Sequence, residues 1–151
     1  GIAPVRKMME MGIPIAIGTD GPASNNCLDM FREMFLVTGL AKILEEDAAA
    51  VDADEVLHMA VSGGAKAMGL SRCDMLKEGK LADMIMLDLH QPNMQPFNNI
   101  SKNLVYSGSK ANIKMTMVNG RILYEDGKFF IGAEPAEIYE NANRIVRELV
   151  Q

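Results

Sequence analysis

An α/β fold that gives way to antiparallel β-structure is the fold class that the sequence predicts. Over residues 4–18 a helix, a glycine and a short apolar strand follow one another, which is the αβ step of an α/β fold. Further along, an Asn-Gly pair at 119–120 separates two β-rich runs, as in a β-hairpin. We therefore expect three regions: an α/β part at residues 1–70, antiparallel strands at 71–133 and a C-terminal helix at 134–151.

The first region begins with a predicted helix and strand. The helix starts near Pro4 and ends at Gly12, which are residue types that favour these two positions. Residues 13–18 read Ile-Pro-Ile-Ala-Ile-Gly, a run typical of a parallel strand that is covered on both faces. Pro14 is acceptable there because it lies near the start of the strand. A polar loop at residues 19–26 follows directly.

Two more helices complete the first region. Residues 28–44 carry apolar side chains at helical spacing. Asp52 and Glu55 have the spacing of a capping box and predict a helix that runs to Gly69. A pair of glycines at 63–64 inside this helix indicates close packing against a neighbouring backbone.

The second region is predicted to be a β-meander. The Asn-Gly pair predicts a type I′ turn, and an Asp-Gly pair at 126–127 predicts a second turn. Residues 90–112 are rich in Asn, Pro, Ser and Gly and are expected to form a loop. The expected strands are a buried one at 84–87, then 113–118, 122–124 and 129–131. Pro135 then starts the last helix, with Ile138, Ala142, Ile145 and Leu149 on one face.

Charge and composition exclude some function classes. The net charge is −5 with acids and bases interspersed, so there is no basic face for nucleic acid. No run approaches the roughly 20 apolar residues of a membrane span, and no signal segment opens the chain. The two cysteines, Cys27 and Cys73, are far apart in the sequence. We therefore expect a cytoplasmic protein with reduced thiols and no nucleic-acid or membrane partner.

Asp20 is the best candidate for a functional side chain. It follows the predicted strand at residues 13–18, and α/β folds place catalytic groups at the carboxyl ends of parallel strands. Asp20 could be an oxygen ligand for a divalent metal, or a base for the attacking water. Two alternatives stay open. Asp20 and Ser24 could cap the helix that follows, or the loop could bind an anion, although it contains no Lys or Arg.

The histidines and cysteines carry no predicted chemistry. His58 and His90 belong to no cluster and to no His-x-His pair. A lone histidine is more often a surface or capping residue than a ligand, so neither receives a role. Cys27 and Cys73 receive none either, and no hydrolytic triad is indicated.

Five short stretches of this sequence occur in the same order as in a known group of enzymes. They are residues 1–5 (Gly-Ile-Ala-Pro-Val), 18–26 (Gly-Thr-Asp-Gly-Pro-Ala-Ser-Asn-Asn), 28–30 (Leu-Asp-Met), 79–83 (Gly-Lys-Leu-Ala-Asp) and 118–121 (Val-Asn-Gly-Arg). Together they resemble the methylthioadenosine/S-adenosylhomocysteine deaminase family, which belongs to the chlorohydrolase-like aminohydrolases of the amidohydrolase superfamily. The resemblance extends over essentially all 151 residues.

This resemblance implies the C-terminal portion of a (β/α)8 metal-dependent hydrolase barrel, plus part of a composite β-sandwich. It implies a divalent metal, zinc or else iron, held by a His-x-His pair, a further His and an Asp. Only the Asp has a match, Asp20, which would also help to move a proton of the attacking water. Gly21, Ser24 and Asn25 would belong to the loop beside a small nucleoside substrate. The histidine ligands and a catalytic Glu would lie upstream of Gly1.

Three functional hypotheses remain. The first is a fragment of a metal-dependent hydrolase of non-peptide C–N bonds, which deaminates adenosine-type nucleosides such as S-adenosylhomocysteine and methylthioadenosine and releases ammonia. A single carboxylate cannot hold a catalytic metal, so we expect the chain alone to be inactive and to retain none. The second is a non-catalytic truncated module whose open sheet edges favour a homo-oligomer. The third is another amidohydrolase activity, such as guanine or cytosine deamination or triazine hydrolysis.

Overall fold

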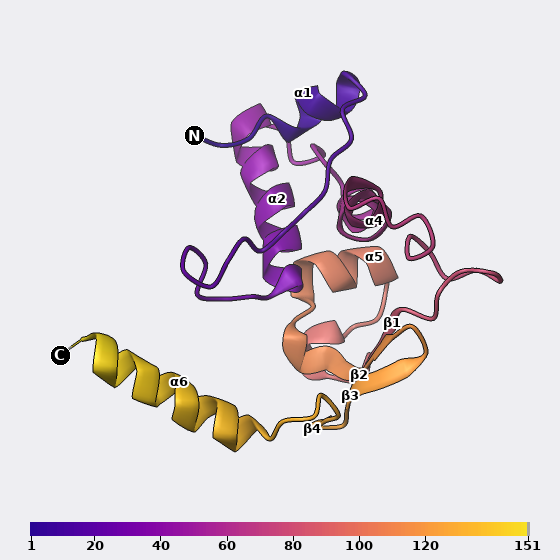
Figure 1. The fold of residues 1–151 in the computed structure, drawn as a ribbon. Coiled ribbons are helices and arrows are strands. Elements are labelled where there is room, and N and C mark those ends of the chain that lie inside the picture. Colours follow the sequence, from indigo (N-terminus) through magenta and orange to yellow (C-terminus); the bar gives the residue numbers. More distant parts are fainter. Residues whose placement is uncertain (151) are drawn as a thin grey trace.

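The computed structural model describes residues 1–150 and combines helices with one antiparallel sheet (Figure 1). The α-helices are α1 (Val5–Glu10), α2 (Met30–Glu45), α3 (Ala53–His58), α4 (Gly64–Ala67), α5 (Ile100–Lys102) and α6 (Pro135–Leu149). Two π-helical turns, η1 (Met59–Gly63) and η3 (Asn103–Ser107), and two 3-10 turns, η2 (Pro92–Met94) and η4 (Lys110–Asn112), lie between them. The strands are β1 (Met84–Leu87), β2 (Ile113–Val118), β3 (Arg121–Glu125) and β4 (Lys128–Phe129).

The sheet is the predicted meander, with its strands in sequence order. All three strand pairs are antiparallel, and Val118 pairs with Arg121 across the first turn. Asn119 and Gly120 have φ values of 49° and 78°, the positive values that a type I′ turn requires. The second turn repeats this conformation, because Asp126 and Gly127 also have positive φ. Both predicted turns are therefore confirmed.

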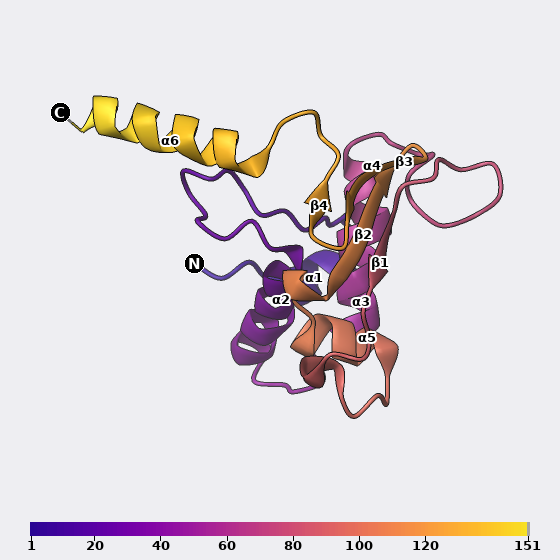
Figure 2. The same ribbon diagram turned by 90° about the horizontal axis from the view of Figure 1, so that it is seen from below.

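The hydrophobic core lies between the helices, not within the sheet. Helix α2 contributes Phe31, Met34 and Ala41, and the helix from α3 into η1 contributes Val56 and Met59. Figure 2 shows these helices grouped on one side of the strands. Val105, in the π-helical turn η3, joins the same cluster, so the segment predicted as a loop at residues 90–112 takes part in the core.

Residues 90–112 therefore correct an expectation. They contain η2, α5, η3 and η4, short turns that sequence periodicity does not reveal. Local side-chain caps start two of them, since the Asn99 side chain accepts a hydrogen bond from the Lys102 N–H and Ser109 accepts one from the Ala111 N–H. Asn and Ser residues, which indicated a loop, thus serve as caps at two of these turns.

Residues 13–18 also differ from the expectation. The segment is extended but belongs to no strand, because no strand of the described residues lies beside it to supply hydrogen bonds. Its side chains are not buried on both faces: Ile15 and Ile17 are half-buried and Ala16 is exposed. A parallel strand needs neighbours for its ladder, and a favourable local sequence does not replace them.

Two strand predictions need smaller corrections. Strand β1 was expected to be buried, but Ile85 and Met86, whose side chains point to opposite faces of the sheet, are 52% and 57% exposed. Strand β4 ends at Phe129, two residues before the predicted end of that strand. Its pairing with β3 is limited to Tyr124 with Phe129 and Glu125 with Lys128.

Helix α6 forms where Pro135 predicts it but buries none of its side chains. In both ribbon views it projects from the rest of the molecule, joined to it only through the segment after β4 (Figures 1 and 2). Its predicted apolar face is open, with Ile145 and Leu149 at 48% and 81% exposure. None of the described helices is long and apolar enough to span a membrane.

The helix from α3 to α4 packs closely on the 13–18 segment through one glycine. The predicted capping box is present, since Asp52 and Glu55 exchange hydrogen bonds of 2.8 and 3.0 Å with each other's backbone. Further along, a Cβ atom placed on Gly63 would lie 2.3 Å from the carbonyl oxygen of Ile15. The adjacent Gly64 has no such neighbour within 4 Å. The expected close packing is therefore confirmed for one of the two glycines.

Replacing these two glycines should have opposite effects on stability. Both have helical φ values, so alanine fits the backbone at either position. We expect Gly63→Ala to lower the free energy of unfolding by about 1–3 kcal/mol, because the new methyl group must displace the Ile15 backbone. Gly64→Ala should raise it by about 0.5–1 kcal/mol, the ordinary gain for alanine within a helix. Urea unfolding of both variants measures this, and equal effects would show that the close contact does not constrain the fold.

Candidate functional site

The candidate site is the loop that follows the extended segment, residues 19–29, and Asp20 is its second residue. Asp20 has φ of 57°, in the left-handed region that few residues other than glycine adopt and that aspartate tolerates best. In this conformation its Oδ1 atom accepts a hydrogen bond of 2.8 Å from the N–H of Gly21. The backbone thus fixes the carboxylate directly after the 13–18 segment.

Gly21 and Ser24 close a tight turn around this carboxylate. The Gly21 carbonyl oxygen accepts hydrogen bonds from the N–H groups of Ser24 at 3.0 Å and Asn25 at 2.9 Å. The Ser24 hydroxyl lies 3.0 Å from the same oxygen and also within reach of the Asp20 carboxylate. The predicted loop residues Gly21, Ser24 and Asn25 are therefore all brought together with Asp20.

These contacts keep Asp20 ionised. The hydrogen bond from the Ser24 hydroxyl lowers the pKa of Asp20, and the N–H of Gly21 lowers it further, while partial desolvation opposes both. The carboxylate is exposed to solvent. An exposed carboxylate that is charged at neutral pH can accept a proton or bind a cation, and it is poorly suited to act as an acid.

Asn25 connects this turn to helix α2. Its Nδ2 atom donates to the carbonyl oxygen of Thr19 at 2.9 Å and to Oε1 of Glu33 at 2.7 Å. Its Oδ1 atom accepts from the N–H of Cys27 at 3.0 Å. Sequence reasoning singled out Asn25 but not Glu33, which lies on the next helix and belongs to no motif.

Asp29, not Asp20, caps helix α2. Its Oδ1 atom accepts a hydrogen bond of 3.0 Å from the N–H of Phe31. The alternative in which Asp20 and Ser24 cap this helix is therefore wrong, because Asp29 lies closer in the chain and is buried at the helix terminus. Its negative charge at the start of α2 disfavours an anion there, so the structure does not support the anion-binding alternative.

The described residues do not form a complete metal site. Asp20 has the chemistry of one oxygen ligand for a divalent cation, and catalytic sites usually offer three protein ligands. Within residues 1–150, no three or more His, Cys, Asp or Glu side chains are grouped so that they could hold a metal ion. The described residues by themselves therefore do not supply the three ligands of a catalytic metal site.

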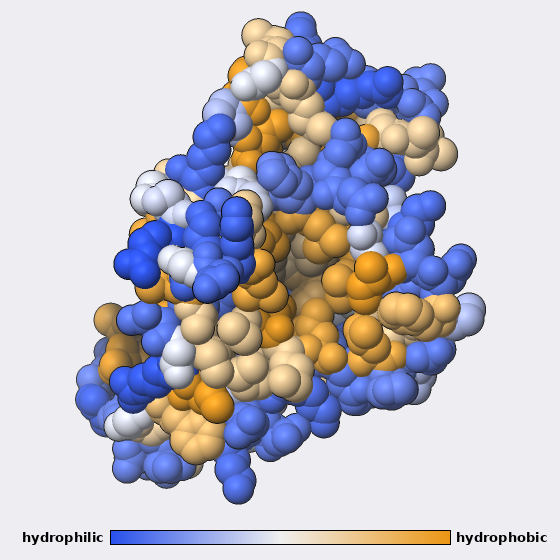
Figure 3. Space-filling model, turned by 90° about the vertical axis from the view of Figure 1, so that its right-hand side faces the viewer, coloured by the Kyte–Doolittle hydropathy of each residue, from blue (hydrophilic) through white to orange (hydrophobic). Residues whose placement is uncertain are grey.

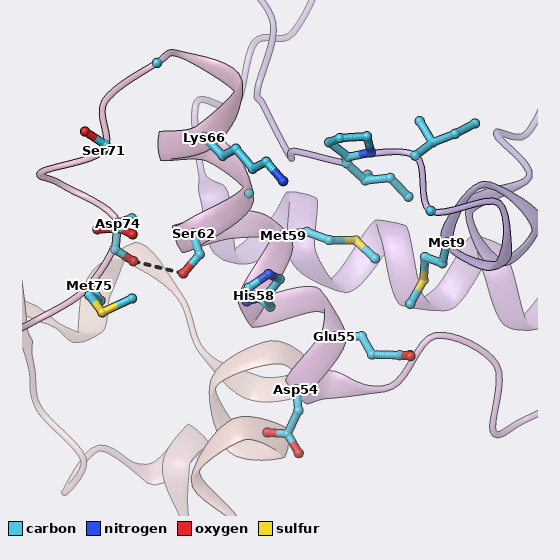
Figure 4. A pocket seen from close by; sticks show the side chains of 16 residues that line it. Met9, Asp54, Glu55, His58, Met59, Ser62, Lys66, Ser71, Asp74 and Met75 are labelled. Carbon is cyan, nitrogen blue, oxygen red and sulfur yellow. Dashed lines mark hydrogen bonds between the residues drawn. The ribbon is translucent and has the colours of Figure 1, made fainter.

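A separate cavity lies at the other end of the extended segment. It has a volume of about 880 Å³ and reaches residues 12–15, while Asp20 follows the segment's far end. Figure 3 shows one face of the molecule hollowed and lined by hydrophobic side chains. Figure 4 shows His58, Met59 and Ser62 on the helix that forms one wall of the cavity. Ser62 donates to the Asp74 carbonyl oxygen at 2.9 Å, so this hydroxyl is already engaged within the protein.

Neither histidine lies in the Asp20 loop. His58 lines the cavity. His90 lies after β1, where its backbone N–H donates to Oδ1 of Asp88 at 2.9 Å. Cys27 and Cys73 are both free thiols, and only Cys27 belongs to the Asp20 loop. The interaction with Asp83, together with desolvation, raises the pKa of the Cys73 thiol and favours its protonated form.

Two curated relatives are similar to this chain in sequence. The 5-methylthioadenosine/S-adenosylhomocysteine deaminase of Desulfovibrio desulfuricans is 49% identical over 129 residues, 85% of this chain and 29% of that protein. The 5'-deoxyadenosine deaminase of Methanosarcina mazei is 40% identical over 150 residues, 99% of this chain and 34% of that protein. This chain thus spans about a third of the length of these curated relatives.

A solved structure and a family profile complete the comparison. The crystal structure of an adenosine deaminase from Xanthomonas campestris with bound zinc superposes with a TM-score of 0.91 and 33% sequence identity. The superposition covers 95% of this chain and 33% of that one. Residues 1–123 match the sequence profile of the amidohydrolase family. The chain therefore belongs to the amidohydrolase family.

Proposed function

We propose that this chain is the C-terminal part of a metal-dependent deaminase that hydrolyses adenosine-type nucleosides. S-adenosylhomocysteine and methylthioadenosine are the substrates we favour. The observation that carries the proposal is Asp20, a carboxylate at the end of an extended segment that accepts a hydrogen bond from the N–H of Gly21 and whose pKa is lowered. The names of the bacterial and archaeal relatives support the nucleoside class, because each is a deaminase of an adenosine derivative.

The architecture that we propose follows the family. Residues 1–70 form the end of a (β/α)8 barrel, residues 71–133 are strands of a composite β-sandwich, and residues 134–151 are a closing helix. The unpaired segment at 13–18 supports this, because a barrel would supply the strands that it lacks. Exposed apolar side chains on α2, such as Phe35 and Ile43 at 50% and 70% exposure, also indicate surfaces made for further polypeptide.

In the reaction, water replaces the amino group on the purine ring and ammonia leaves. A divalent metal, zinc in preference to iron, supplies the activation of the attacking water. Asp20 would contribute one ligand to that metal and would accept a proton from the attacking water, and a proton must reach the amino group for it to leave as ammonia. Gly21 and Ser24 favour the charged form of the Asp20 carboxylate. Asn25 donates a hydrogen bond to the Thr19 carbonyl oxygen at the start of the loop. Bound zinc in the superposed adenosine deaminase supports the choice of metal.

The remaining ligands come from polypeptide outside residues 1–151. We therefore expect the isolated chain to bind the metal weakly and to be inactive, and we expect the active protein to be a cytoplasmic homo-oligomer. The intact mass of the native polypeptide tests this. A mass near three times the 16.5 kDa of this chain supports the proposal. A mass near 16.5 kDa, with no ammonia released from the three nucleosides S-adenosylhomocysteine, methylthioadenosine and 5'-deoxyadenosine, favours the non-catalytic module.

Asp20→Asn should remove activity and leave the fold intact. In the native polypeptide that carries this sequence, we expect kcat for ammonia release to fall on the order of 100-fold or more, because the amide neither ligates a cation well nor accepts the proton. The control is Asp126→Asn, which makes the same change at another residue of positive φ, 44° as against 57°. Turnover that is unchanged in Asp20→Asn would show that this carboxylate takes no part in the chemistry.

Ser24→Ala should raise the pKa of Asp20. The hydroxyl favours the charged carboxylate, so its loss moves the pKa of Asp20 upward toward the ordinary value. Because the pKa is depressed in the folded state, the stabilisation it provides is present above the unfolded pKa and is lost as the pH falls through the folded pKa. Carboxyl-carbon NMR titration measures the shift, with Ser71→Ala as the control. An unchanged pKa in Ser24→Ala would mean that the hydroxyl serves only the Gly21 carbonyl oxygen.

A further inference from the structure

We propose that Glu33 is a positioning residue, which holds Asp20 in place through the side chain of Asn25. The inference rests on the proposed function, since it assigns Glu33 a role in catalysis by way of Asp20. The geometry that carries it is a pair of hydrogen bonds that Nδ2 of Asn25 donates, one to Oε1 of Glu33 and one to the carbonyl oxygen of Thr19. Thr19 is the residue directly before Asp20.

The side chain of Asn25 is fully engaged by this arrangement. Its Nδ2 atom carries two hydrogens, which go to Thr19 at 2.9 Å and Glu33 at 2.7 Å, and its Oδ1 atom accepts from Cys27 at 3.0 Å. One amide therefore connects both ends of the turn to helix α2. If Glu33 is removed, one N–H of Asn25 loses its acceptor, and the amide is free to rotate away from Thr19.

Glu33 offers a firm anchor because its helix is fixed in the core. Its neighbours Phe31 and Met34 are buried at 7% and 4% exposure. The backbone N–H of Glu33 donates to the Asp29 carbonyl oxygen at 3.2 Å, which secures the first turn of α2. A carboxylate acceptor also gives a shorter and stronger hydrogen bond than a neutral one, consistent with the 2.7 Å distance.

An anchor outside the loop adds to the hydrogen bonds that the loop makes within itself around Asp20. The left-handed conformation at φ of 57° is costly for a residue with a side chain and persists only where the surroundings hold it. The loop from residue 19 to residue 29 contains no helix or strand. Asn25 fixes the carbonyl group of Thr19, and hence the peptide plane from which Asp20 departs.

A second explanation for Glu33 is that its charge merely favours the N-terminus of α2. Two substitutions separate these explanations. Glu33→Gln removes the charge and keeps an oxygen that can accept from Asn25, whereas Glu33→Ala removes both. If only the helix terminus matters, the two variants behave alike. If the hydrogen bond to Asn25 matters, Glu33→Gln retains most of the wild-type behaviour.

The test uses the native polypeptide, with kinetics and amide hydrogen exchange as separate readouts. We expect Glu33→Ala to lower kcat for deamination about 10- to 100-fold and to change KM less than about 3-fold, because a displacement of about 1 Å at a reacting group has effects of this size. Amides of residues 19–27 should exchange about 10-fold faster. In Glu33→Gln, both values should stay within about 5-fold of wild type. Glu45→Ala, at the other end of α2, is the control and should match wild type.

Three further outcomes decide the inference. Combining Asn25→Ala with Glu33→Ala should cost little more than Asn25→Ala alone, because Asn25→Ala already removes the hydrogen bond to Glu33. Fully additive effects, or normal kcat and exchange in Glu33→Ala, would overturn it even if Asp20→Asn is inactive. If Asp20→Asn instead keeps its turnover, the proposed function fails and the catalytic role of Glu33 fails with it. Hydrogen exchange then still decides separately whether Glu33 holds the loop.

Discussion

The close approach of Gly63 to the carbonyl oxygen of Ile15 is the contact on which the candidate site depends. The 13–18 segment has no strand beside it among the described residues. It packs instead against the helix that carries Gly63. Ile15 and Ile17 then reach the helical core from the same segment. This segment leads directly into the loop that carries Asp20.

The loop after this segment is held from the opposite side. Phe31 and Met34 fix α2 in the core, and Glu33 between them carries the hydrogen bond to Asn25. One end of the Asp20 loop is therefore set by backbone packing and the other by a polar side-chain connection. The apolar side chains that pack the 13–18 segment and α2 lie outside the loop. The loop itself exposes its polar groups, as a reactive site requires.

Features that depend on neighbouring residues could be predicted from the sequence. The Asn119-Gly120 turn and the capping box at Asp52 follow from chemistry within four residues, and both are present. Asp20, Gly21, Ser24 and Asn25 come together for the same reason, because a single turn contains them all. The role of Asp29 as the cap of α2 was missed, since several polar residues nearby could equally have served.

Features that depend on distant partners could not be predicted in the same way. The apolar run at 13–18 has a strand-like sequence, but a strand exists only where another chain segment pairs with it. Glu33 is one acid among many on helix surfaces, and only the folded chain shows that it faces Asn25. The turns at η2 and η3 were hidden because their Asn and Ser residues are also common in loops.

The projection of α6 has a consequence for the cooperativity of unfolding. None of its side chains is buried, so its melting removes no contact from the core, and the rest of the chain should unfold as a separate unit. A helix of 15 residues without a packed face is only marginally stable in water. Its helicity therefore depends on whichever surface covers Ile145 and Leu149. Far-ultraviolet ellipticity that rises with protein concentration, or on adding further polypeptide, would report that covering directly.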